Sequence, residues 1–170
     1  TRIAQENPLF VVCPSDEVEM TAGKNRRTRA LERSIQFAEK MAAKEYAHLL
    51  EDKFLFKVVV PSTKPGAIDS QLPSKCCDDD SSISGSGSRY DGVCAGSINL
   101  TETEKEFTDH VREVRAATWK EGKALLVQGS NSLTRLLLSL EMGADLVSSN
   151  LPTILTNGGN ALTMDLDLFG

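Results

Sequence analysis

Five short apolar runs divide the chain, and each stops at a proline, a glycine or a pair of serines. The runs cover residues 9–13, 54–60, 91–96, 124–129 and 145–149. Apolar runs of this length, bounded by turn-forming residues, are typical of buried β-strands. The pattern therefore predicts five strands, of which 54–60 carries the most β-branched and aromatic side chains.

Between the runs, apolar residues recur every three or four positions, which is the period of an amphipathic helix. This period predicts helices over 23–52, 101–121 and 132–142. Thr101 and Glu104 have the Thr-x-x-Glu spacing of a capping box, and Gly122 would end that helix. We expect the last two helices to bury Phe107, Val111, Val114, Ala117, Trp119, Leu133, Leu136, Leu137 and Leu140.

The order of these elements predicts a parallel sheet with helices packed against both faces. Five strands fit either a doubly wound sheet or part of a (β/α)8 barrel, which needs about 250 residues when complete. Either architecture collects functional groups at the carboxyl ends of the strands. After the last strand, the Asn157-Gly158 pair predicts a hairpin turn, with 161–165 as its returning limb.

One domain over 1–170 is expected, with a flexible loop at about 69–89. This stretch is rich in serine and aspartate, and it cannot bury enough apolar surface to offset the entropy of ordering it. Gly85 and Gly87 would also suit a phosphate-binding loop, but the acidic residues before them would repel phosphate.

Composition and charge narrow the possible function classes. The chain has 170 residues, of which 40% are hydrophobic and 25% charged, so it is an ordinary globular sequence. Its 19 lysines and arginines against 24 acidic residues give a net charge of −5, which excludes a generally basic nucleic-acid-binding protein but not a local RNA-facing patch. With no long apolar run and no signal sequence at Thr1, we expect a cytoplasmic protein.

Cysteine and histidine give little support for a metal site. The four cysteines, Cys13, Cys76, Cys77 and Cys94, follow no zinc-binding spacing. His48 and His110 both fall in helical patterns. We therefore expect reduced thiols and no metal ligands within this chain.

The expected carboxyl edge of the sheet is polar but contains no histidine. Asp16 and Glu17 are the only carboxylates that directly follow a strand. Asp16 suits either a helix cap or a functional role, while Ser148 and Ser149 suit hydrogen bonds within a loop. A serine without a neighbouring base is a weak nucleophile, so this edge alone does not predict acid–base or covalent catalysis.

Residues 143–163 resemble the signature of tRNA-guanine transglycosylases: Gly-x-Asp, the catalytic aspartate three residues on, Leu-Pro-Thr, and a Gly-x-Ala-x-Thr ending. The matching residues are Gly143, Asp145, Leu151, Pro152, Thr153, Gly159, Ala161 and Thr163. Tyr90-Asp-Gly92 and Gly96-Ser-Ile98 are similar to the family's glycine-containing base-binding strand. The resemblance implies an α/β fold of the (β/α)8 TIM-barrel type, here a partial barrel of about five strands.

The same resemblance implies the remnant of a base-binding pocket. Its residues would be Asp16, Gly96, Ser97, Gln128 and Gly129. In catalytic members an aspartate attacks the ribose and holds the RNA covalently while one base replaces another. Ser148 stands at that position, so we expect no catalytic residue in this chain. Val60 replaces a base-binding glutamine, and Ile154 and Asn157 replace arginines.

These departures resemble the accessory, non-catalytic subunits of eukaryotic queuine tRNA-ribosyltransferases within the family. The resemblance implies a heterodimer with a catalytic subunit, contact with tRNA through the complex, and association with the outer mitochondrial membrane. It also implies zinc ligands beyond Gly170, as if the chain were a fragment covering barrel strands four to eight. Two alternatives stay open: an active transferase that uses Asp16 or another acid, and an unrelated small α/β ligand-binding protein.

Overall fold

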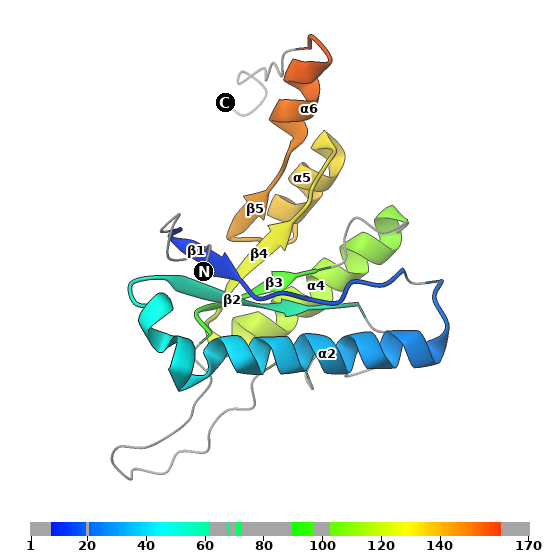
Figure 1. Ribbon diagram of the computed structural model, residues 1–170. Helices are drawn as coiled ribbons and strands as arrows, with labels where there is room; N and C mark the ends of the chain where they lie inside the picture. The colour runs from blue at the N-terminus through cyan, green and yellow to red at the C-terminus, as the bar shows by residue number, and fades with distance from the viewer. Residues whose placement is uncertain are drawn as a thin grey trace.

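A parallel sheet of five strands, curled into half a barrel, organises the molecule (Figure 1). The computed structural model describes residues 8–19, 21–61, 68, 71–72, 90–96 and 103–160. The strands lie side by side in chain order and are β1 (Phe10–Val12), β2 (Phe54–Val59), β3 (Gly92–Ala95), β4 (Ala124–Gln128) and β5 (Leu146–Ser148). Every neighbouring pair is parallel, which confirms the predicted partial (β/α)8 barrel.

Described helices follow β1, β3, β4 and β5 and cover the outside of the curl, as Figure 1 shows for α2 and α4. They are α2 (Lys24–Ala42), the 3-10 helix η1 (Lys44–Leu49), α4 (Glu104–Glu121), α5 (Leu133–Glu141) and α6 (Leu151–Asn157). The helix expected over 23–52 is thus two elements. Ala43 adopts an extended backbone with ψ 149° and ends α2, and η1 then leads into β2.

The amino end of α4 differs from the prediction by two residues. Its cap is Thr103, whose hydroxyl accepts from the Glu106 backbone N–H at 3.2 Å, while the Thr103 N–H donates to the Glu106 carboxylate at 3.0 Å. Around this helix start the Thr-x-x-Glu spacing occurs at both 101–104 and 103–106, so the motif alone did not identify the starting residue. Gly122 ends the helix in a left-handed conformation, as predicted.

The predicted hairpin at Asn157-Gly158 is wrong. Residues Leu151–Asn157 form α6, with a proline in its first turn, and the Gly158 N–H donates to the Ile154 carbonyl at 3.1 Å. The Asn-Gly pair therefore ends a helix instead of turning a strand. The expected returning limb, 161–165, lies outside the described residues.

Apolar side chains are buried on both faces of the sheet. On the helix side, α4 packs Phe107, Val111 and Val114 with no exposed surface against β3 and β4, as predicted. Trp119, by contrast, is 71% exposed, and the Arg115 guanidinium lies 4.7 Å from its ring centroid. The apolar face expected on the next helix is also largely uncovered, with Leu133, Leu137 and Leu140 exposed.

Candidate functional site

The carboxyl ends of four strands form one row on the face of the sheet turned away from α4. The strand registers pair Val59 with Ala95, Ala95 with Val127, and Gln128 with Ser148, and extending the first two by one residue aligns the positions that follow β2 and β3 with the ends of β4 and β5. We call this row the carboxyl-edge layer, and it consists of Val60, Gly96, Gln128 and Ser148. Just below it, Phe56, Val58, Cys94 and Leu126 form a buried cluster, as expected for side chains that alternate between faces. The layer brings together Gly96 and Gln128, two of the residues expected in a base pocket, with Ser148.

Gly96 places no side chain in the middle of the carboxyl-edge layer, between Val60 and Gln128. A Cβ added there would lie 2.3 Å from Val58 Cγ1 and 3.7 Å from Glu17 Oε1. The first distance is far below van der Waals contact, so a larger residue would force the buried Val58 side chain or the backbone of Gly96 to move. The second shows that the Glu17 carboxylate reaches over Gly96 from the segment after β1.

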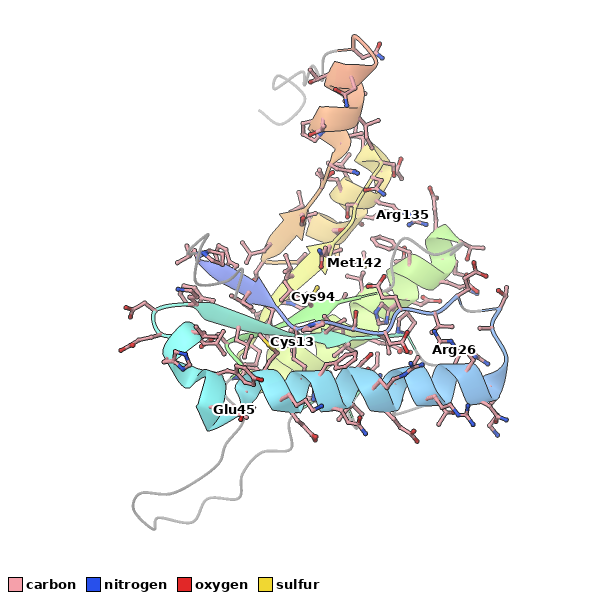
Figure 2. The ribbon with its side chains drawn as sticks, in the orientation of Figure 1. Cys13, Arg26, Glu45, Cys94, Arg135 and Met142 are labelled. Carbon is pink, nitrogen blue, oxygen red and sulfur yellow. The ribbon has the colours of Figure 1, made fainter. Side chains whose placement is uncertain are left out.

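The Cys94 thiol lies directly beneath the layer, in the middle of the sheet (Figure 2). Its Sγ is 3.7 Å from the Gln128 side-chain oxygen. Burial raises the pKa of Cys94 to about 12, and the Glu17 carboxylate adds to the rise. This thiol is therefore protonated at neutral pH and can act as a weak hydrogen-bond donor to Gln128 but not as a nucleophile.

The Asp16 carboxylate is held by two arginines of α2. The Arg26 guanidinium donates to both carboxylate oxygens at 3.2 Å, and Arg33 Nη2 lies 2.6 Å from Asp16 Oδ2. The Asp16 backbone N–H donates to Ser34 Oγ at 2.9 Å. The interpretation of Asp16 as a helix cap is wrong, because α2 begins after Gly23 and has no side-chain cap.

Of the two carboxylates after β1, it is thus Glu17 that approaches the layer. Sequence reasoning considered both residues and placed Asp16 in the pocket. A signal for the observed arrangement was present, since Arg26 and Arg33 are seven residues apart and share one helix face. Such a pair offers an aspartate nearby two positively charged partners.

Val60 is held by a glutamine that sequence reasoning missed. The Val60 N–H donates to Gln71 Oε1 at 2.9 Å, and Gln71 Nε2 donates to the Val60 carbonyl at 3.0 Å. Gln71 and Leu72 are both buried, although they fall within the stretch 69–89 that was expected to be a surface loop. The other residues of that stretch lie outside the described residues, and so does Ser97.

Ser148 and Ser149 join the ends of β4 and β5. The Gly129 and Ser130 N–H groups donate to the Ser148 carbonyl at 2.9 and 3.2 Å. Ser149 Oγ donates to the Ser130 carbonyl and accepts from the Leu151 N–H, so its predicted role in loop hydrogen bonding is confirmed. The Ser148 side chain is exposed at the end of β5 and carries no negative charge.

Neither histidine lies at this edge. His110 is on α4, behind the sheet, and burial lowers its pKa to about 4. His48 lies in η1, which precedes the amino end of β2. The Ser148 hydroxyl therefore has neither histidine beside it to act as a general base.

Two aspartates of the family motifs have structural roles. Asp91 Oδ2 accepts from the Leu55 N–H at 2.8 Å, and Asp145 Oδ2 accepts from the Leu125 N–H at 2.8 Å. Asp145 also pairs with Arg115 at 2.9 Å. Each aspartate thus binds the backbone of the second residue of a neighbouring strand. Both contacts lie at the amino end of the sheet, opposite to the carboxyl-edge layer.

The part of the chain that the structure describes holds no group of three histidine, cysteine or acidic side chains suited to a metal ion. Cys13 and Cys94 are buried free thiols with pKa values raised to about 12, mainly by burial. None of the described helices combines the length and apolar character needed to cross a bilayer.

Comparison with known proteins agrees with the geometry. A sequence model of the queuine tRNA-ribosyltransferase family matches residues 8–168, a span that holds all five strands and every described helix. A comparison with curated proteins found no match. Because the family match covers nearly the whole chain, this protein belongs to the queuine tRNA-ribosyltransferase family, the tRNA-guanine transglycosylases.

Proposed function

We propose that this chain is a non-catalytic subunit of a heteromeric queuine tRNA-ribosyltransferase, which exchanges guanine for queuine at the wobble position of tRNA. The observation that carries the proposal is Ser148, an exposed hydroxyl at the position where the resemblance places the nucleophilic aspartate. A neutral serine lacks the ionised oxygen needed to form and hold a covalent ribosyl intermediate at neutral pH.

The surroundings of Ser148 support the same conclusion. Val60, in the same row, offers only an apolar side chain where catalytic members have a base-binding glutamine. Both oxygens of the Asp16 carboxylate already accept from arginine side chains. The chemistry would then belong to a catalytic partner subunit, and this chain would contact tRNA within the complex. The implied zinc and outer mitochondrial membrane association remain expectations of the resemblance.

One observation favours an active transferase instead. The Glu17 carboxylate lies over Gly96, at the edge where a bound base and its ribose would sit. A carboxylate there could attack a ribose directly, provided that the substrate approaches from the β1 side of the layer. The variant Glu17→Gln removes this charge with little change in shape and therefore distinguishes the two functions.

Reconstitution tests the proposed function. This chain and a catalytic transglycosylase subunit are purified alone and together, and incorporation of labelled guanine into tRNA is measured for each. We expect no exchange by this chain alone, and co-purification with at least a severalfold gain in exchange when the partner is added. The Glu17→Gln variant should support the same gain. Exchange by this chain alone that Glu17→Gln abolishes would instead establish the active-transferase function.

A further inference from the structure

The solvent-exposed surface of α2 carries a row of positive charge that the carboxyl-edge layer does not explain. Arg26, Arg29, Arg33, Phe37 and Lys40 follow one another at spacings of three, four, four and three residues. Residues at these spacings share one face of a helix. All five are exposed, and the row, which we call the basic stripe, runs for about 21 Å along the helix.

Charge is segregated around α2. Glu32 and Glu39 are seven residues apart and occupy a different face from the basic stripe. The buried face is formed by Ala30, Ser34 and Ala38, which pack toward the sheet. Because the chain as a whole has a net charge of −5, a stripe with four cations and no acidic member is a local departure from its average.

The cations nearest the carboxyl edge are held in place. Asp16 accepts hydrogen bonds from Arg26 and forms an ion pair with Arg33, and Arg33 Nε donates to the Arg29 carbonyl at 3.4 Å. Figure 2 shows Arg26 pointing from α2 toward the segment that follows β1. The two arginine side chains remain 50% and 47% exposed. Each guanidinium has five N–H donors, so Asp16 positions both groups while leaving donors directed to solvent.

This arrangement suits a ribose-phosphate backbone. Three of the four cations are arginines, whose planar donor fork matches phosphate oxygens. Phe37, at 37% exposure, interrupts the row with an aromatic face on which an unpaired base can stack. The segment that joins β1 to α2 connects this row to the carboxyl-edge layer.

We propose that the basic stripe of α2 binds the phosphate backbone of tRNA directly. The proposal rests on the proposed function, because it names the surface through which a subunit without its own chemistry would hold the RNA substrate. Each phosphate contact releases bound counterions, so the affinity should fall steeply as salt increases.

Charge reversal tests the stripe. The double variant Arg29→Glu/Lys40→Glu avoids the residues bound to Asp16, and the control Arg112→Glu/Lys120→Glu makes the same charge change on exposed positions of α4. Binding of a labelled tRNA transcript is measured over a range of salt concentrations, with circular dichroism to show that both variants fold. We expect the α2 variant to bind at least about 10-fold more weakly than the control and to lower the salt slope by about 1.5.

Equal affinities for the two double variants, or an unchanged salt slope, would overturn the proposal. So would an α2 variant that keeps its RNA affinity but no longer co-purifies with the catalytic subunit, since the stripe would then be a protein interface. The outcome is separable from the proposed function. If the α2 variant loses RNA binding, the proposal for the basic stripe is supported even if this chain does not increase base exchange by the catalytic subunit. If this chain increases base exchange but the α2 variant binds RNA as tightly as the control, only the proposal for the basic stripe is rejected.

Discussion

Replacing Gly92 by alanine should lower the free energy of unfolding by about 3 kcal/mol or more. Gly92 opens β3, where an added Cβ would lie 2.4 Å from Phe56 Cε1 and 2.8 Å from the Ala124 carbonyl oxygen. The ring could rotate only against its own buried neighbours, and the carbonyl belongs to the backbone of β4. The strain therefore has to separate β3 from β2 or β4, and β3 is the central strand of the sheet.

Denaturant unfolding followed by circular dichroism measures this loss. Gly23→Ala is the matched control, because its Cβ would meet nothing within 4 Å and its φ of −58° suits alanine. The control should change stability by less than about 1 kcal/mol. Similar midpoints for the two variants would show that β3 is not packed as tightly as described.

Acid should destabilise the protein through His110. Burial lowers the pKa of this imidazole from 6.5 to about 4, and a hydrogen bond with the Val59 backbone opposes the shift only in part. Its Nε2 is buried without a hydrogen-bond partner, so a proton there would be poorly solvated. Because the folded-state pKa is the lower one, the unfolded chain binds the proton first, and stability falls as pH decreases.

The window for this loss runs from about pH 6.5 to about pH 4, and its size is about 3 kcal/mol. The contribution of His110 to the free energy of unfolding should not change with pH above this window, and it should level off below the window. The variant His110→Asn cannot titrate, so its stability should depend less on pH than that of the wild type, whatever its absolute value. Equal slopes for wild type and His110→Asn would contradict the prediction.

The sheet could be predicted from the sequence because each strand has a local signal. The run before Pro61, for example, contains β2 (Phe54–Val59), and apolar character on both faces correctly indicated a parallel sheet. Helix boundaries were less certain, because overlapping Thr-x-x-Glu motifs compete for one helix start. The hairpin predicted at Asn157-Gly158 was wrong because an Asn-Gly pair can also end a helix. Whether it turns a hairpin or ends a helix depends on the residues before and after it.

The arrangement of the site depends on side-chain directions, which spacing does not encode. The sequence located the carboxyl edge, and the strand registers bring Gly96, Gln128 and Ser148 into one row there. It did not reveal that Asp16 turns toward α2 while Glu17 turns toward Gly96. That choice is made by Arg26 and Arg33, which are close to Asp16 only once α2 has packed on the sheet. Gln71 was missed for a similar reason, since its partner is the backbone of Val60.

The most direct test of the account asks whether RNA becomes covalently attached to this chain. Wild-type protein and the Ser148→Asp variant are each incubated with tRNA and a slowly released base analogue, then separated by denaturing electrophoresis, with an active transglycosylase as the positive control. We expect no adduct on either, because an aspartate at position 148 would still lack the base-binding contacts missing at Val60, Ile154 and Asn157. A covalent RNA–protein band on the wild-type chain would contradict the central claim that it has no nucleophile of its own.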